Sequence, residues 1–160
     1  MKAISLKSRP ETLRAKSIDG SFWFYGGYSP LGTDDKEGII HVWFPEMQEY
    51  AEMTVHAETL SRNTGLKDKN GNPVYQYDIV SFLAKATDSD AKDKLRFYTV
   101  EWNSARAAFI LFPIFLEKDE GIQLSPDMID LHESIICGNF FDNLEEVSYR
   151  RIAEMLHKVI

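Results

Sequence analysis

Residues that could do chemistry are few and widely spaced in this chain of 160 residues. His132-Glu133 begins like the HExxH motif of zinc proteases, but Ile136 stands where the second histidine would be. That motif needs two histidines one helical turn apart to bind zinc while the glutamate acts as a base, so it is absent here. The remaining histidines lie far apart and show no ligand spacing around the single cysteine, which predicts no metal site.

The one cysteine, Cys137, is interpreted as a packing residue rather than a nucleophile. It follows Ile135-Ile136 at the end of an apolar run, where a thiol acts as a small buried hydrophobe. The chain contains no GxSxG, Walker or GxGxxG pattern, and the acidic residues from Asp119 to Glu133 match no known cation-binding loop. We therefore expect no cofactor and no enzymatic activity.

Three tryptophans, Trp23, Trp43 and Trp102, have tyrosine or phenylalanine neighbours. Such residues can form a platform on which single-stranded bases stack. The core of a β domain uses the same residues, and that interpretation is preferred. The run Phe22–Tyr25 is too rich in aromatics to alternate between core and solvent, so both faces of that strand are expected to be covered.

The charge distribution bears on nucleic-acid binding. The net charge is −7, and only residues 61–118 carry an excess of cations, nine Lys or Arg against seven Asp or Glu. Affinity for a phosphate backbone comes mainly from clustered cations, so the balance disfavours this partner without excluding it. The alternative hypothesis is a nucleic-acid-binding regulator in which these residues share a face: Lys67, Lys69, Arg96, Arg106 and Trp102.

Length and composition favour one domain over residues 1–160 in the cytoplasm. No window approaches eighteen consecutive apolar residues, so no membrane span is expected, and the N-terminus lacks the apolar run of a secretory signal. A single cysteine fits a reducing compartment. Hydrophobic residues make up 44% of the chain and aromatic residues 12%, which is ample for a core and favours strands.

The elements that would position these residues are mainly β. Residues 64–80 predict a hairpin whose Asn70-Gly71 pair is typical of a type I′ turn. Residues 95–102 alternate clearly and turn back at 103–106 into 108–112, which predicts a second hairpin, and Ser125-Pro126 is a typical helix start. Residues 84–94 predict a loop. An amphipathic C-terminal helix is expected over about 143–158. The predicted fold is a small, partly open barrel with extra hairpins and this helix.

The stretch Thr64–Gly71, followed by Val74-Tyr75 and Asp78–Val80, resembles the signature of the YopX family. An N-terminal block, Leu13–Lys16 with Trp23–Gly26, and a closing block around Gly138-Asn139 occur in the order the family would have them. The signature positions, interpreted as structural turn and strand residues, are these: Gly65, Leu66, Lys67, Asp68, Asn70, Gly71, Tyr75, Asp78, Ile79, Val80, Trp23, Tyr25, Gly26, Gly138 and Asn139.

The resemblance implies a small phage- or prophage-encoded protein without an established activity. It also implies an SH3-like barrel portion and self-association, so a homo-oligomer is expected and a separate protein partner is possible. One departure stands out, since the family usually has Glu-Gly before Asp78 where this chain has Gln76-Tyr77. If that glycine supplies a tight backbone in relatives, the local turn must be built differently here. The preferred hypothesis is a non-enzymatic protein that acts through self-association or protein binding.

Overall fold

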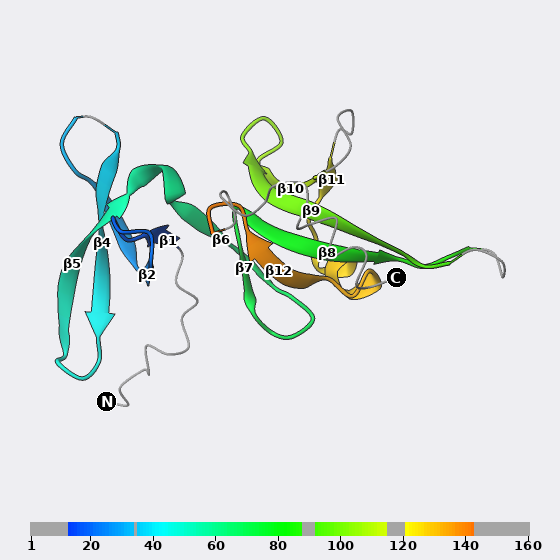
Figure 1. Cartoon of the computed structure of the whole chain (residues 1–160), viewed down its shortest axis with the longest axis horizontal. Coiled ribbons are helices and arrows are strands. Elements are labelled where there is room, and N and C mark those ends of the chain that lie inside the picture. The colour runs from blue at the N-terminus through cyan, green and yellow to red at the C-terminus, as the bar shows by residue number, and fades with distance from the viewer. Residues whose placement is uncertain (1–12, 34, 88–91, 115–120, 143–160) are drawn as a thin grey trace. The chain divides into compact units, whose positions relative to one another are not determined.

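The computed structural model describes residues 13–33, 35–87, 92–114 and 121–142 (Figure 1). The helix expected over 143–158 lies outside the described residues, and only the two ends of the 84–94 loop lie within them. Within the described residues, the architecture is mostly β with a curled, half-barrel sheet and one short helix, so the predicted mainly β fold is confirmed. The chain divides into two compact units, residues 1–65 and 66–160, and each is described by itself.

The first unit contains two short sheets. Strand β1 pairs antiparallel with β2 and with β6, and β3, β4 and β5 form a three-stranded antiparallel sheet in that order. Its buried core consists of Ala15, Ile40 and Val55. The elements are β1 (Leu13–Lys16), β2 (Trp23–Tyr25), β3 (Gly27–Pro30), β4 (Glu37–Phe44), β5 (Glu49–His56), a 3-10 turn (Ala57–Thr59) and β6 (Ser61–Lys67), which runs into the second unit.

The second unit is built on a five-stranded antiparallel sheet of order β11-β10-β9-β8-β12 (Figure 1). Alternate residues of β9 face opposite sides, with Tyr98 and Val100 in the main core and Phe97 in a smaller cluster on the other side. The elements are β7 (Pro73–Tyr75), β8 (Asp78–Ala84), β9 (Lys94–Asn103), β10 (Ala108–Pro113), β11 (Ile122–Gln123), α1 (Pro126–Leu131) and β12 (Ile135–Asn139).

Several local predictions are confirmed in this unit. Strands β9 and β10 form the expected hairpin, closed by a hydrogen bond from the Arg106 amide to the Asn103 side chain. Helix α1 begins as expected, because the Ser125 hydroxyl accepts a hydrogen bond from the Met128 amide and Pro126 takes the first position. Strand β12 continues to Asn139 and absorbs an irregularity between Ile136 and Gly138 as a bulge.

The expectation that the tryptophans form the core is wrong. Trp23, Trp43 and Trp102 are only half-buried, and the buried core is mostly aliphatic. The run Phe22–Tyr25 is also not covered on both faces, because β2 lies at the edge of its sheet and Phe22 and Tyr25 are exposed. At these positions the aromatic residues therefore lie on partly exposed strands rather than in the core.

Candidate functional site

The Thr64–Gly71 signature forms a turn that is built around the carboxylate of Asp68. One oxygen of Asp68 accepts hydrogen bonds from the Asn70 and Asn72 amides at 2.9 and 2.8 Å, and the other accepts one from the Ile136 amide of β12 at 3.1 Å. Asp68 is buried, so these bonds replace its hydration. The side chain thus shapes the turn and ties it to the sheet of the second unit.

The turn type differs from the prediction. Gly71 has a positive φ of 83°, but Asn70 does not, so the two-residue type I′ turn is wrong. The Gly71 amide bonds the Asp68 carbonyl, and the Asp68 amide bonds the Asn72 carbonyl. This is the pattern of a type I turn followed by a left-handed glycine. The Asp68 side chain favours it because it accepts from the amide two residues further on.

A second buried carboxylate, Asp78, is the partner of the closing block. It accepts hydrogen bonds from the Tyr75 amide at 2.8 Å and from the Asn139 side-chain amide at 3.2 Å. The Asn139 side-chain oxygen, Oδ1, in turn accepts a hydrogen bond from the Phe141 amide at 2.8 Å. Strands β8 and β12 place Asp78 and Asn139 opposite each other in the sheet. Signature residues 61 positions apart are therefore joined in one hydrogen-bonded network.

Tyr77 occupies the position where a glycine is expected from the family resemblance. Its φ is 69°, so a tyrosine adopts a left-handed backbone at this position. The Tyr77 ring packs edge-on against Phe141, with 4.9 Å between the ring centroids, and its amide bonds the Val100 carbonyl at 2.7 Å. These contacts offset the strain of a positive φ in a residue with a Cβ.

We expect Tyr77→Gly to be more stable than Tyr77→Ala by about 1 kcal/mol, because both variants lose the ring and only alanine keeps the left-handed strain. At an ordinary position the order is reversed, since glycine is the more flexible residue in the unfolded chain. Urea unfolding of the two variants measures the difference. Equal stabilities, or a more stable alanine variant, would contradict the strain at Tyr77.

The remaining signature positions also lie in structural roles. Gly65 and Gly71 adopt positive φ, and Tyr75, Ile79 and Val80 are buried. Leu66 packs on the main core and Lys67 is exposed. A Cβ on Gly26 would collide with the backbone carbonyl of His41, so only glycine allows this approach. In the N-terminal block, the Arg14 guanidinium and the Lys16 ammonium lie over the Trp23 ring at 4.4 and 5.5 Å.

The cations of the nucleic-acid hypothesis do not gather at one place in the second unit. Arg96 and Trp102 share a face of β9 but are six residues apart, about 20 Å along a strand. Arg106 lies in the β9–β10 turn. Lys69 pairs with Glu133 at 2.8 Å, and this contact lowers the pKa of Glu133.

Cys137 packs beside Ile79 and Phe97 rather than facing a reactive neighbour. Its Sγ donates a hydrogen bond to the Ile79 carbonyl at 3.4 Å, and burial raises the pKa of the thiol to about 11. Because the thiolate is the reactive form, this environment suppresses nucleophilic chemistry. The packing interpretation fits this position.

We expect Cys137 to react with a disulfide reagent at pH 8 about a hundredfold more slowly in the folded protein than in urea. The raised pKa favours the neutral thiol, so its contribution to stability is present below pH 9.0 and is lost as the pH rises through about 11. Labelling followed by mass spectrometry measures the rates. Equal rates in folded and unfolded protein would contradict this account.

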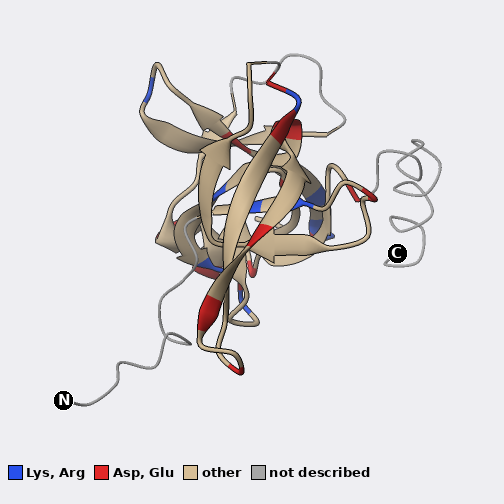
Figure 2. Ribbon diagram, turned by 90° about the vertical axis from the view of Figure 1, so that its left-hand side faces the viewer, with Lys and Arg blue, Asp and Glu red and all other residues tan. Residues whose placement is uncertain are grey.

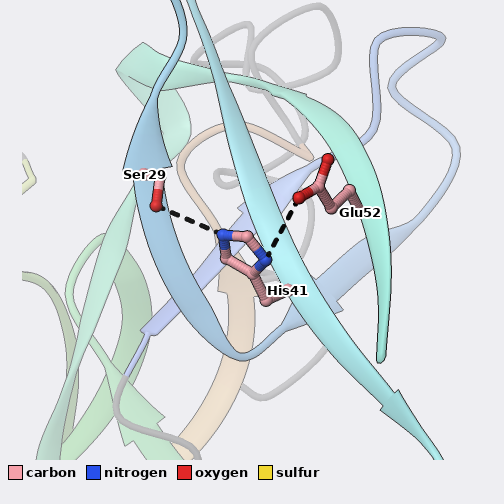
Figure 3. A network of polar contacts seen from close by, with 3 residues as sticks. All are labelled: Ser29, His41 and Glu52. Atoms are coloured by element: carbon pink, nitrogen blue, oxygen red, sulfur yellow. Dashed lines mark hydrogen bonds and ion pairs between the residues drawn. The ribbon is translucent and has the colours of Figure 1, made fainter. Parts of the chain in front are cut away.

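Three polar side chains form a row that sequence spacing did not predict. Ser29 on β3, His41 on β4 and Glu52 on β5 lie side by side across the sheet (Figure 3). The Ser29 hydroxyl lies 3.2 Å from His41 Nε2, and Glu52 Oε1 lies 3.9 Å from His41 Nδ1. The acid–imidazole distance exceeds a hydrogen bond, and the Glu52 side chain is 67% exposed. The order serine, histidine, glutamate is that of a nucleophile–base–acid triad. The distance between Glu52 and His41 and the exposure of Glu52 to solvent do not suit such a triad.

The exposed end of the β4–β5 hairpin is the strongest candidate for a functional surface. Met47 and Tyr50 are 59% and 63% exposed, and the Tyr50 ring lies against Trp43 with 4.8 Å between centroids. Trp43 and Tyr50 are direct cross-strand partners, one residue inside the Phe44–Glu49 pair. We call Trp43, Met47 and Tyr50 the hairpin tip. Met47 and Tyr50 stand in a polar stretch of the sequence, residues 46–52, so their types alone did not single out this surface.

Two further structural findings concern metals and membranes. Within the described ranges, no group of three or more His, Cys, Asp or Glu side chains is placed to hold a metal ion. The helix that the structure describes, α1, is too short to cross a bilayer, and no other described segment forms a long apolar helix.

These features define a mostly β protein whose signature residues build turns and strand pairings. The chain belongs to the YopX protein family, whose model matches residues 15–146. Among solved structures, it is similar to the crystal structure of protein EF1440 from Enterococcus faecalis, at 19% identity over 84% of this chain and 95% of that chain, with a TM-score of 0.47. A search of curated proteins gave no match.

Proposed function

We propose that this protein is not an enzyme and acts by binding protein molecules, a second copy of itself or another protein, through the hairpin tip. Following the family resemblance, we infer a phage- or prophage-derived protein with an SH3-like barrel portion. We place it in the cytoplasm because a single cysteine fits a reducing compartment. The observation that carries the proposal is the exposure of Met47 and Tyr50 beside Trp43 at the end of one hairpin.

Exposed side chains of these types favour protein contacts on physical grounds. Burying a side chain of this size removes apolar surface from water at about 25 cal/mol per Å². Aromatic residues in particular dominate the energetics of protein interfaces. The Trp43–Tyr50 pair holds one ring against another, so less side-chain entropy is lost when a partner covers them.

Light scattering on the protein purified from cells that make it tests the proposal. We expect a particle heavier than the 18.4 kDa chain, and we expect Met47→Ser/Tyr50→Ser to return it to the mass of one chain. Leu131→Ser is the matched control, because Leu131 is 66% exposed in the other unit. A wild-type protein at the single-chain mass, or a hairpin variant with the wild-type mass, would contradict the proposal.

The same measurement addresses the nucleic-acid alternative, and an activity assay addresses the enzymatic one. Nucleic-acid binding through the central region would give excess 260 nm absorbance that high salt removes from the peak. The separation of Arg96 from Trp102 and the pairing of Lys69 with Glu133 give this alternative less support. Catalytic turnover that one substitution abolishes without unfolding the protein would contradict the non-enzymatic proposal.

A further inference from the structure

Within the described residues of the first unit, the outer edge of β5 is open over part of its length. β5 is the end strand of its sheet, and over Glu49–Met53 the described residues offer it no pairing partner other than β4 (Figure 1). At its far end, Val55 makes an isolated bridge with Ser17, and His56 bonds the Ile18 carbonyl at 2.8 Å. The open part is thus the half next to the hairpin tip.

An open strand edge presents a row of backbone amides and carbonyls that can pair with another chain. Proteins usually protect such edges by making them short, by a proline or bulge, or by charges that repel another edge. β5 contains no proline, and its pairing with β4 is in continuous register over eight residues. Charged side chains protect this edge against pairing with a like edge, because β5 carries exposed glutamates.

The β4–β5 hairpin is strongly acidic. Residues 35–58 contain six carboxylates and one lysine. Figure 2 shows acidic residues along this part of the chain. Glu49 and Glu52 lie in the open half of β5 and Glu46 lies in the adjoining turn, and all three are exposed. A second β5 edge of the same kind would bring glutamates close to glutamates, and like charges on neighbouring strands disfavour pairing.

We propose that the open edge of β5 binds an extended, lysine- or arginine-rich segment of a partner protein as an additional strand. Backbone hydrogen bonds would supply affinity, and the glutamates would select basic side chains. This inference rests on the proposed function, since the edge adjoins the hairpin tip, and it names the chemistry of the partner.

The pleat of the sheet gives the segment two different faces. Tyr50 and Glu52 project on the same face as Trp43 and His41, because these residues are direct cross-strand partners. Glu49 projects on the opposite face, with Phe44 as its partner. A segment with cations on both faces therefore meets a glutamate on each, and it meets the Tyr50 ring on one. Arginine and lysine can also lie over that ring.

Fluorescence anisotropy with a labelled nine-residue peptide, in which pairs of adjacent lysines are separated by valine and threonine so that cations project on both faces, tests the inference on the full chain. We expect saturable binding that weakens as salt is raised. The same peptide with glutamates in place of lysines should bind at least tenfold more weakly. So should a lysine peptide with a central proline, because proline removes an amide from the ladder.

Substitutions in the protein test whether the peptide binds at β5. Glu49→Lys/Glu52→Lys should weaken binding at least tenfold, and Glu49→Gln/Glu52→Gln should weaken it by a smaller factor. The matched control is Glu101→Lys/Asp130→Lys, which makes the same charge change at exposed positions of the second unit and should bind like wild type. Circular dichroism checks that each variant is folded.

Three results would overturn the inference: no binding, equal binding by the proline peptide, or equal loss in the Glu101→Lys/Asp130→Lys control. The last two would mean charge attraction without strand addition at β5. The light-scattering experiment separates these failures from failure of the proposed function. If the particle is heavier than one chain and its mass depends on Met47 and Tyr50, the proposal of protein binding is supported even where the basic-segment inference is wrong.

Discussion

Replacing Asp68 with alanine should lower the free energy of unfolding of the second unit by about 3 kcal/mol, because three backbone amides lose their acceptor at a buried position. A charged acceptor makes the stronger kind of hydrogen bond, which increases the expected loss. The effect should reach beyond the turn, since the Ile136 amide belongs to β12. Urea unfolding followed by circular dichroism measures it.

Two further variants sharpen this test. Asp68→Asn keeps one acceptor oxygen for the turn but places an NH2 group against a backbone amide, so an intermediate loss is expected. Asp130→Ala removes an exposed carboxylate from α1 and should change stability by less than about 0.5 kcal/mol. If Asp68→Ala is no more destabilising than Asp130→Ala, the structural role of the Thr64–Gly71 signature is wrong.

The second large effect is expected at Asp78. Asp78→Ala should lower the free energy of unfolding by about 3 kcal/mol, because the buried Tyr75 amide and the Asn139 side chain lose their partner. Asn139→Ala should be destabilising for the same reason. Their double variant should lose clearly less than the sum of the two single losses, because the residues contact each other. Strictly additive losses would contradict the network that joins β8 to β12.

The sequence predicted the elements of the second unit better than those of the first. Alternate residues of β9 pack in two different clusters, and its turn residues are local, so pattern alone found the β9–β10 hairpin. The Ser125-Pro126 start of α1 is also a local signal. Both features depend on residues that are neighbours in the chain, which is the case in which periodicity and capping rules are informative.

The misses arose where a distant residue decides the outcome. The turn at Asn70-Gly71 takes its type from the Asp68 carboxylate, which also binds β12, 68 residues away. Tyr77 tolerates a positive φ because Phe141 packs on its ring. Neither partner can be found from the local sequence. The half-buried tryptophans follow from sheet edges and hairpin ends, which appear only once strand order is known.

In the candidate site, too, the sequence predicted the roles that depend on local residues and missed those that depend on distant ones. The signature residues could be interpreted as structural from their types, because glycines, asparagines and aspartates in turns have known roles. The hairpin tip could not be found, since a methionine and a tyrosine in a polar stretch are as typical of a packed strand as of an exposed one. The row of Ser29, His41 and Glu52 required the registers of two strand pairs.

Site-specific photo-crosslinking in the cells that make the protein tests the central claim most directly. A photoreactive phenylalanine analogue would replace Tyr50 in one variant and Leu131 in another, two positions with nearly equal exposure, 63% and 66%. Protein binding through the hairpin tip predicts a discrete crosslinked protein species from position 50 and none from position 131. No species from position 50, or the same species from both positions, would contradict the claim.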